Sequence, residues 1–433
     1  MMSVVGTVLI FLAVLSFLIA IHEGGHLISA KLTGVWVHEY AIGFGPSLVS
    51  KKIRETTYSL KPIPFGGYVR MAGEDVGEEA DQDEEVPEER KFYSQSPLKK
   101  MFISVSGPAM NIIAAVLIMI LVVGVVGSPR ISIYGFMENS PSQGQLKLGD
   151  QLIKLEGKKL TSSNQIDALL PEDNPRKVKV TVLRNGGKLE FSIKPKYYED
   201  SGKYMLGVKL GTAMTNEVAG IQEDTVLSRT GLEPGDRITA INGNPVNGGA
   251  SIVSALGKLE SGEQVVFTVD RDGRSVNLTV SPEGPEELLK GFSLKTISDP
   301  VGPGTAIKQG LRQIKNIIIL TYQGIKLIIS GKIPAGEAVT GPVGIANLLG
   351  QSARRGMYSL FLMVSLISLN LGLINLVPFP ALDGSRIGYA TYELIRGKPI
   401  PPEKEGLINS IGFLILIGLM IFITYRDIIK FFN

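Results

Sequence analysis

The chain of 433 residues contains no cysteine and only three histidines, which are His22, His26 and His38. The absence of cysteine excludes a disulfide framework, a thiolate metal site and a cysteine nucleophile. A transition metal held by imidazole therefore has very few candidate ligands. Charged residues are also scarce, at 20% of the chain against about 25% in average proteins. The net charge of +3 is too small to indicate binding of nucleic acid, so we expect no nucleic-acid partner.

The scarcity of charge is local, because it coincides with long apolar runs. A membrane span needs about 20 mostly apolar residues. The sequence predicts four spans, at about residues 4–30, 101–127, 358–377 and 407–425. The first run could be read as a signal peptide, but no Lys or Arg precedes it, which favours an uncleaved helix.

Basic residues predict the orientation of these spans. None precedes the first span, ten lie between Lys31 and Lys100, and four follow the third span. Because Lys and Arg collect in cytoplasmic loops, we expect both loops inside. The N-terminus, the C-terminus and the region Ser128–Gly356 are then outside. The acidic run Glu74–Glu89 counts little in this rule, and we expect a solvated linker there.

The outer region contains an internal repeat. Residues 147–160 read KLGDQLIKLEGKKL and residues 233–246 read EPGDRITAINGNPV, with an offset of 86 residues. Later, VKVTVLRNGG (178–187) matches VVFTVDRDG (265–273) with an offset of 87. Each unit predicts a Gly-Asp turn, a strand, a helical stretch and a hairpin that turns at Asn-Gly or Asp-Gly.

The repeat resembles two tandem α+β PDZ domains, at 128–200 and 201–290. PDZ domains bind an extended peptide or a C-terminus by adding it to a sheet edge. Two interpretations remain open, namely peptide or substrate gating and a pair of spacers that filter substrates by size.

A basic amphipathic stretch lies within the linker 291–356. Apolar residues fall on one helical face, and Lys308, Arg312, Lys315 and Lys326 interrupt the run; the apolar set is Ile307, Leu311, Ile314, Ile318, Ile325 and Ile328. This pattern suits a helix on the membrane surface. An ordinary packed helix remains an equal alternative.

The first span carries the motif HEGGH at residues 22–26. His22 and His26 share a helix face, so both imidazoles can reach one ion, and Glu23 can act as general base toward water on the metal. Ionisable residues inside a span are costly and are functional candidates by default. The alternative is a helix whose His and Glu side chains pair with other buried polar groups.

A catalytic zinc usually takes three protein ligands, so a third ligand is needed. His38 lies outside the apolar run, and we interpret it as a loop histidine. Asp383 is the better candidate, because it follows the third span. The first and third spans both run from outside to inside, which places Asp383 at a depth similar to that of His22 and His26. Pro378 and Pro380 break the helix there, as a site that admits water and a peptide requires.

Three motifs together resemble the site-2 protease family of intramembrane zinc metalloproteases. They are HEGGH in the first span, GPAMN at 107–111 and NLVPFPALDG at 375–384. Four spans with two PDZ domains between the second and third resemble the bacterial regulator-of-sigma-E protease branch of this family, which implies the plasma (inner) membrane of a bacterium. The resemblance covers essentially the whole chain. It implies a polytopic α-helical membrane protein whose core is split into 1–127 and 357–433.

The resemblance also implies residue roles. Zn²⁺ would be bound by His22, His26 and Asp383, with Glu23 as catalytic base. Asn375 would position substrate, and Pro378 and Pro380 would shape its segment. Gly24 departs from the family, which usually has a bulkier residue there. Adjacent glycines cost about 2 kcal/mol of helix propensity relative to alanine but remove no ligand.

The loop after the first span is rich in Gly and Pro, and Thr56–Leu60 is predicted as a strand. In the family this region resembles a membrane-associated β-loop that dips toward the active site. A helical substrate must unwind before attack, and an exposed strand edge can hold the unwound segment. We place that edge at Gly66, Gly67, Tyr68, Val69, Arg70 and Met71. The alternative is a surface hairpin that only seals the site.

By resemblance, the substrates are single-pass membrane proteins already shortened by a first protease, such as an anti-sigma factor, or signal-peptide remnants. Two other classes of function remain. A membrane-bound PDZ adaptor would use the metal structurally. A metal transporter would need ionisable residues in further spans, and the predicted second and fourth spans contain none.

Overall fold

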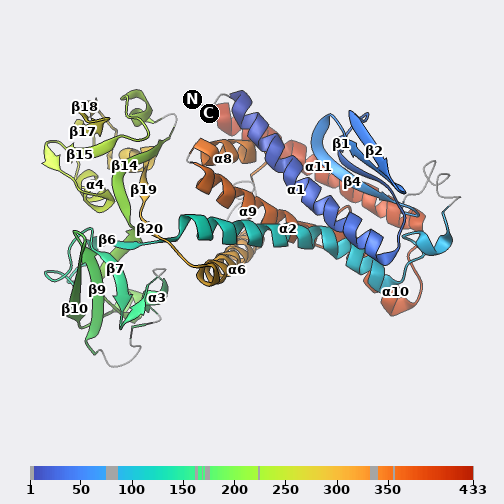
Figure 1. Ribbon diagram of the computed structural model, residues 1–433, viewed down its shortest axis with the longest axis horizontal. Helices are drawn as coiled ribbons and strands as arrows, with labels where there is room; N and C mark the ends of the chain where they lie inside the picture. The colour runs from blue at the N-terminus through green and yellow to red at the C-terminus, as the bar shows by residue number, and fades with distance from the viewer. Residues whose placement is uncertain are drawn as a thin grey trace. The chain divides into compact units, whose positions relative to one another are not determined.

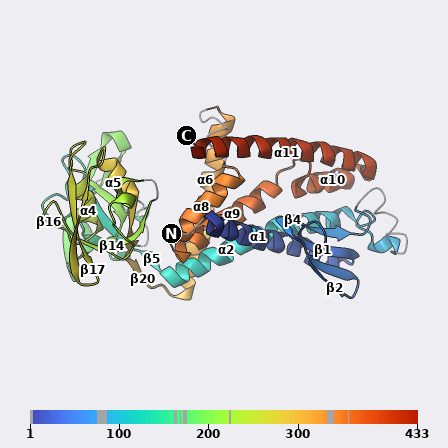
Figure 2. The ribbon, with the colours of Figure 1, turned by 90° about the horizontal axis from the view of Figure 1, so that it is seen from above.

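The computed structural model describes residues 4–74, 86–160, 164–167, 169–170, 176–222, 225–331, 340–354 and 356–432. The chain divides into two compact units (Figures 1 and 2). Residues 1–122 and 304–433 form the helical unit, and residues 123–303 form the repeat unit. The central part of the acidic run, residues 75–85, lies outside the described residues.

Four helices of the described chain are long and apolar enough to cross a membrane. They are α1 (Val4–Thr33), α2 (Pro97–Val126), α9 (Met357–Asn375) and α11 (Pro402–Phe432). Each corresponds to one predicted span. Helix α11 begins at Pro402, ahead of the predicted Leu407, because proline and acidic residues suit the first turn of a helix although they are not apolar.

Small and polar side chains join helices α2 and α9. The Ser368 hydroxyl donates to the carbonyl oxygen of Asn111 at 2.7 Å, and the Ser365 hydroxyl donates to that of Ala115 at 2.8 Å. A Cβ at Gly372 would lie 2.7 Å from the Pro108 carbonyl oxygen. Such small residues allow helices to pack closely within a membrane, where the hydrophobic effect does not drive helices together.

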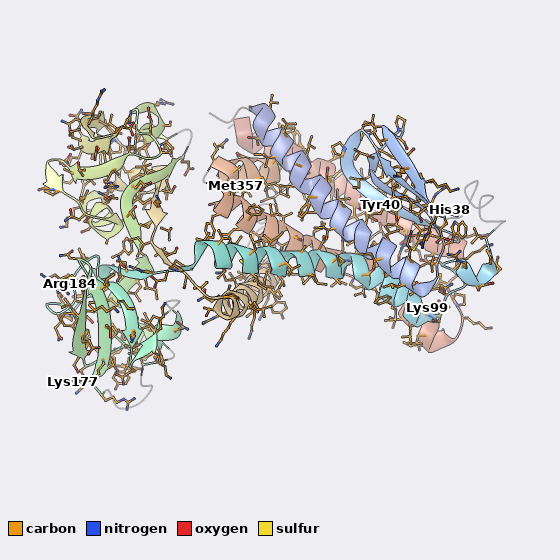
Figure 3. The ribbon with its side chains drawn as sticks, viewed as in Figure 1. His38, Tyr40, Lys99, Lys177, Arg184 and Met357 are labelled. Atoms are coloured by element: carbon orange, nitrogen blue, oxygen red, sulfur yellow. The ribbon has the colours of Figure 1, made fainter. Side chains whose placement is uncertain are left out.

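A four-stranded sheet follows α1 in the chain. Its strands are β1 (Val37–Phe44), β2 (Val49–Ile53), β3 (Thr56–Leu60) and β4 (Ile63–Met71), in the order β2-β3-β1-β4. The predicted strand Thr56–Leu60 is therefore present as β3. Strand β4 contains Gly66–Met71 and is an edge of this sheet. His38 lies on β1 rather than in a loop, beside Tyr40 (Figure 3).

The sheet is fixed against α1. The Tyr40 hydroxyl donates to the carbonyl oxygen of Ala20 at 2.9 Å. A Cβ at Gly67 would lie 2.7 Å from Ile19 Cγ2 on the same helix, so β4 approaches α1 closely because residue 67 has no side chain. The sheet is thereby held beside the helix that carries the histidine motif.

The predicted basic amphipathic stretch is a helix, α6 (Pro303–Ile329). Ile314 packs with Ala115 and Met119 of α2. By contrast Ile307, Leu311, Ile318 and Ile325 are exposed. One face of α6 is therefore packed, and contact of the exposed apolar residues with a membrane surface stays a prediction.

The helical unit also contains the 3₁₀ turn η2 (Glu88–Arg90), α8 (Pro342–Arg354) and α10 (Asp383–Arg396).

The repeat unit contains two sheets of the same design. The first has the order β10-β9-β7-β6-β13, with β8 paired to β7. Its elements are β6 (Ile131–Phe136), β7 (Gln151–Leu155), β8 (Lys158–Lys159), α3 (Asn164–Asp167), β9 (Val178–Arg184), β10 (Gly187–Ile193) and β13 (Val208–Thr212).

The second sheet has the order β18-β17-β15-β14-β19, with β16 paired to β15. Its elements are β14 (Met214–Ile221), η4 (Val226–Arg229), β15 (Arg237–Ile241), β16 (Asn244–Pro245), α4 (Gly249–Leu256), β17 (Val265–Arg271), β18 (Arg274–Val280), α5 (Pro285–Gly291) and β19 (Phe292–Thr296). Two short ribbons complete the unit: β11 (Lys196–Tyr198) with β12 (Lys203–Met205), near η3 (Glu199–Ser201), and β5 (Ser128–Pro129) with β20 (Ser298–Asp299).

The same ion pair, between a buried aspartate and a partly exposed arginine, recurs in both sheets. Arg184 donates to Asp150 at 2.7 and 2.6 Å, and Arg271 donates to Asp236 at 2.7 Å through each of two nitrogens. Each aspartate is the second residue of the predicted Gly-Asp turn. Burial alone would raise the pKa of Asp236, but hydrogen bonds from Arg271 and from the Glu233 N–H lower it below its usual range.

Each sheet closes with a strand beyond the predicted repeat. Strand β13 pairs with β6 and lies after residue 200, whereas β19 pairs with β14 and lies after residue 290. The repeat motif ends at the hairpin, so it gives no signal for a strand that returns to the start of the sheet.

Candidate active site and metal centre

The two motif histidines lie one turn apart on α1 and are both buried. Their Nε2 atoms are 3.3 Å apart. His26 Nδ1 is 2.9 Å from the carbonyl oxygen of Ile103 on α2, so with Nδ1 protonated the ring leaves Nε2 free for a metal. Gly107 lies against this ring, since a Cβ there would be 2.7 Å from His26 Cε1.

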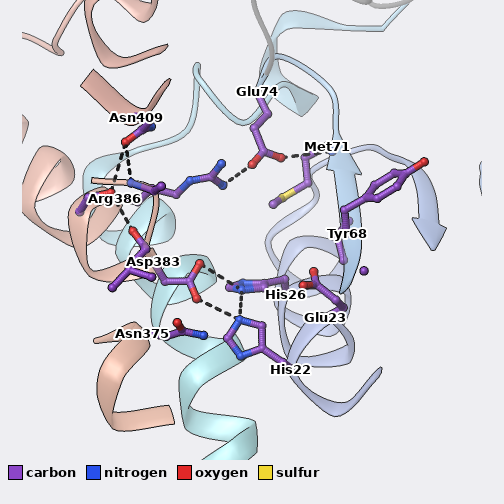
Figure 4. A pocket seen from close by; sticks show the side chains of 15 residues that line it. His22, Glu23, His26, Tyr68, Met71, Glu74, Asn375, Asp383, Arg386 and Asn409 are labelled. Carbon is purple, nitrogen blue, oxygen red and sulfur yellow. Dashed lines mark hydrogen bonds and ion pairs between the residues drawn. The ribbon is translucent and has the colours of Figure 1, made fainter. Parts of the chain in front are cut away.

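Asp383, the first residue of α10, faces both histidines (Figure 4). Its Oδ2 lies 3.0 Å from His22 Nε2, and its Oδ1 lies 3.3 Å from His26 Nε2. Within the described chain, these three residues form a group that could hold a metal ion, with candidate ligand atoms within 4.8 Å of one another. His38 is not part of it.

The cluster opens into a cavity of about 360 Å³. Five elements line it: α1, β4, the end of α9, α10 and α11. Of the residues selected from sequence, the lining includes His22, Glu23, His26, Gly67, Tyr68, Val69, Met71, Asn375 and Asp383. Pro378, Pro380, Gly66 and Arg70 are not in the lining. Pro380 instead lies against Gly412 of α11. A Cβ added to Gly412 would be 2.6 Å from the carbonyl oxygen of Pro380.

Strand β4 borders the cavity beside Glu23. A Cβ at Gly67 would lie 3.3 Å from Glu23 Cγ, so the backbone of β4 passes close to the motif. The Tyr68 phenol points away from the histidines in Figure 4. It donates to Glu39 and accepts from Lys61. Burial raises the pKa of Tyr68, as does the bond to Glu39, so this side chain is a neutral anchor that holds β4 to β1.

Comparison with known proteins decides the family. A family model described as peptidase family M50 matches residues 10–419. The chain belongs to peptidase family M50. The site-2 protease family predicted from the motifs is therefore confirmed.

Curated relatives of this M50 peptidase match over essentially their whole length. The zinc metalloprotease RasP of Geobacillus kaustophilus is 29% identical, over 100% of each chain. The regulator of sigma-W protease RasP of Bacillus subtilis is 28% identical, over 99% of each chain. Among solved structures, the PDZ domain of an SdrC-like protein from Listeria monocytogenes is 19% identical, covering 18% of this chain and 85% of that chain, with a TM-score of 0.17. The protein is a zinc metalloprotease and a membrane protein.

The donor set fits zinc, and a buried amide supports the fit. Asn111 Nδ2 lies 3.2 Å from His22 Nδ1, while its Oδ1 has no hydrogen-bond partner within the described chain. With the amide turned by 180°, Oδ1 accepts from a protonated Nδ1, and Nδ2 takes the position that has no partner within the described chain. His22 Nε2 is then free on the side that faces Asp383, which is the tautomer that a metal ligand needs.

Four polar residues of the cavity were missed from the sequence, namely Glu74, Ser385, Arg386 and Asn409. Arg386, one turn after Asp383, forms an ion pair with Glu74 at the end of β4. Asn409 of α11 accepts a hydrogen bond from the Ala381 N–H at 3.3 Å. A signal existed for Asn409, because a polar side chain within an apolar span is a functional candidate. Nothing in the pattern around Glu74 and Arg386 indicates that they meet.

Proposed function

We propose that this M50 peptidase hydrolyses peptide bonds within transmembrane segments of single-pass membrane proteins. The observation that carries the proposal is the position of the group that could hold a metal ion. His22 and His26 belong to α1, which is apolar enough to cross a membrane, and they meet Asp383 beside a cavity bounded by α9 and α11. A site built there suits a substrate that arrives within the bilayer.

In this proposal, His22, His26 and Asp383 hold the zinc. When bound, zinc supplies Lewis acidity, which polarises the scissile carbonyl and makes water more acidic. Ile103 orients the His26 imidazole and Asn111 orients the His22 imidazole, each through the Nδ1 atom. Asp383 supplies the anionic ligand and partly neutralises the cation.

Glu23 acts as the general base and then the general acid. It follows His22 directly and lines the same cavity. Its carboxylate takes the proton of the attacking water and delivers it to the leaving nitrogen. The adaptor alternative differs here, because a structural metal would not need Glu23.

The free edge of β4 would hold the unwound substrate beside Glu23. Edge strands present unpaired backbone groups that pair with an added strand. Asn375 lines the cavity and would contact the substrate backbone, while Pro378 and Pro380 shape the segment before Asp383.

The native absence of cysteine allows a direct test of this edge. In a Glu23→Gln background, Val69→Cys, at a cavity-lining position of β4, should form a disulfide under mild oxidation with a single cysteine placed near the scissile bond. Lys51→Cys on β2 is the matched control, because β2 is the opposite edge of the sheet. Equal trapping at both positions would refute a role for β4.

The catalytic proposal is tested by zinc content and by cleavage of a model single-span substrate in lipid vesicles. Glu23→Gln should retain zinc and lose cleavage, whereas Asp383→Ala should lose zinc and cleavage together. Removal of zinc by a chelator should stop cleavage, and added zinc should restore it in the wild type. Normal cleavage by Glu23→Gln would favour the adaptor.

Substrate class and orientation extend the proposal. The relative in Bacillus subtilis is named a regulator of sigma-W protease, which supports an anti-sigma factor, shortened by a first protease, as substrate. Signal-peptide remnants are a second substrate class. The excess of Lys and Arg between α1 and α2 supports a cytoplasmic β-sheet, with both termini and the repeat unit outside.

The two repeats would be PDZ domains that exclude substrates with bulky outer domains or bind peptides and C-termini. Deleting residues 131–297 leaves the β5–β20 ribbon able to join α2 to α6. Under size exclusion this deletion should increase cleavage of an unshortened substrate and leave cleavage of a shortened one unchanged. A loss of both activities would instead favour recruitment by the repeats.

A further inference from the structure

The segment that leads into Asp383 is a compact turn between α9 and α10. The Phe379 N–H donates to the Val377 carbonyl at 2.7 Å, and the Leu382 N–H donates to the Phe379 carbonyl at 3.0 Å. Ala381 has φ of +73°, a left-handed value that is uncommon for a residue with a side chain. Such a backbone persists only when its surroundings hold it. Something outside the turn must therefore stabilise it.

That support comes from Asn409 of α11. Its Oδ1 accepts from the Ala381 N–H at 3.3 Å, from the Tyr389 hydroxyl at 3.1 Å and from the Ser385 hydroxyl at 3.5 Å. Ala381 precedes Asp383, while Ser385 and Tyr389 follow it on α10. One amide oxygen thus accepts from the backbone before Asp383 and from two side-chain hydroxyls of α10 after it.

A second contact from the same helix acts on the same turn. Gly412 lies about one turn after Asn409 and faces Pro380. A Cβ added to Gly412 would lie 2.6 Å from the Pro380 carbonyl oxygen. Helix α11 therefore fits closely over the turn at residues 380–381. Many of its apolar side chains, such as Phe413 and Leu414, are exposed.

We propose that Asn409 is a positioning residue that fixes the metal-binding orientation of Asp383. This rests on the proposed ligand set His22, His26 and Asp383. Helix α11 supplies none of those ligands, yet through Asn409 it sets where the carboxylate points. A polar side chain in an apolar span is costly unless it is hydrogen-bonded, and here the bonds are made to the ligand-bearing turn.

The experiment compares Asn409→Ala, Asn409→Asp, Gly412→Ala and Ser410→Ala in the full-length protein in detergent. Loss of zinc to a chelator is followed over time, together with kcat, KM and the thermal unfolding temperature. Ser410→Ala is the matched control, because its hydroxyl donates only to the Gly406 carbonyl of its own helix in the described contacts. Asn409→Asp keeps an acceptor oxygen at the same position.

Removal of an outer-shell partner of a ligand typically costs 10- to 100-fold in metal affinity or activity. We expect Asn409→Ala to lose zinc at least about tenfold faster and to lower kcat with little change in KM. Asn409→Asp and Ser410→Ala should retain zinc like the wild type. Gly412→Ala tests the same turn through a separate contact, and it should also release zinc faster even if Asn409→Ala fails to fold.

Wild-type zinc retention and kcat in Asn409→Ala would overturn the proposal. Equal impairment of Asn409→Ala and Asn409→Asp would also overturn it, because the acceptor oxygen would not matter. Asp383→Ala distinguishes failure of the proposed ligand set from failure of the role proposed for Asn409. If it retains zinc, the proposed ligand set is wrong; if it loses zinc while Asn409→Ala does not, only the role of Asn409 fails.

Discussion

The Nδ1 atom of His26 lies 2.9 Å from the carbonyl oxygen of Ile103, which joins the histidine motif on α1 to the backbone of α2. This contact fixes the ring of His26, and it depends on a close approach of the two helices. Glycines permit that approach. A Cβ at Gly25 would lie 2.8 Å from the Ser106 carbonyl carbon, and a Cβ at Gly107 would touch His26 itself.

Gly107→Ala should therefore weaken zinc binding although residue 107 is not a ligand. The added methyl group would displace the His26 ring from Ile103 and from the metal position. We expect at least about a tenfold loss of zinc affinity, the effect typical of disturbed outer-shell contacts. Competition with a fluorescent zinc chelator measures it. Wild-type affinity in this variant would show that the ring adapts and that its position is not fixed by α2.

The two adjacent motif glycines should respond oppositely to substitution. A Cβ at Gly24 meets no atom within 4 Å, whereas one at Gly25 collides with the α2 backbone. Gly24→Ala should preserve activity and raise helix stability by about 1 kcal/mol. Gly25→Ala should reduce folded, zinc-loaded protein. Cleavage of a substrate in membranes and zinc content distinguish the two variants. Equal effects of both substitutions would contradict the described packing of α1 on α2.

Asn111 should control the tautomer of His22. Asn111→Leu removes the acceptor for the His22 Nδ1–H, so proton and metal would compete for the ring. Asn111→Asp keeps an acceptor oxygen and is the matched variant. We expect zinc affinity to fall in the leucine variant by about ten- to 100-fold and to be kept in the aspartate variant. Full zinc affinity in Asn111→Leu would remove Asn111 from the metal site.

The second repeat should lose stability in acid through Asp236. Its pKa is lowered in the folded state, so its pairing with Arg271 contributes stability above the unfolded pKa of about 3.9. That contribution is lost as pH falls through the lower folded pKa. Asp236→Asn should destabilise this repeat at pH 7, because Arg271 loses the ionised partner of its two hydrogen bonds.

Hydrogen exchange of β15 and β17 in the whole protein measures this stability. Asp272→Asn is the control, because Asp272 is exposed in the neighbouring turn, where asparagine also tolerates its positive φ of 50°. The difference between wild type and Asp236→Asn should shrink as pH falls from about 4 to about 2. A constant difference over this range would show that the carboxylate charge is not the cause.

Orientation can be measured because the chain has no cysteine to interfere. A membrane-impermeant maleimide added outside intact cells should label Lys188→Cys in the repeat unit. It should label Lys398→Cys, between α10 and α11, only after the cells are opened. Labelling of Lys398→Cys in intact cells would invert the proposed topology.

The sequence by itself determined the features that depend on composition or on local spacing. Apolar runs located the four helices of the described chain that are long and apolar enough to cross a membrane, because a span is recognised by length and hydropathy alone. The separation of His22 from His26 determined that both share a helix face. The 86-residue offset showed the repeat, and it anticipated equivalent Gly-Asp turns at Asp150 and Asp236. In these cases the physical cause lies within a few residues or in a pattern along the chain.

Only the tertiary structure decided how distant segments meet. It brought Asp383 to the histidines, 357 residues after His26 (383 − 26). It also paired Glu74 with Arg386, returned β13 and β19 to the starts of their sheets, and placed Asn409 over the turn at Ala381. These contacts depend on helix packing and on sheet closure, which sum many weak interactions across the chain. A motif can name the residues that perform chemistry, but packing determines which neighbours hold them in place.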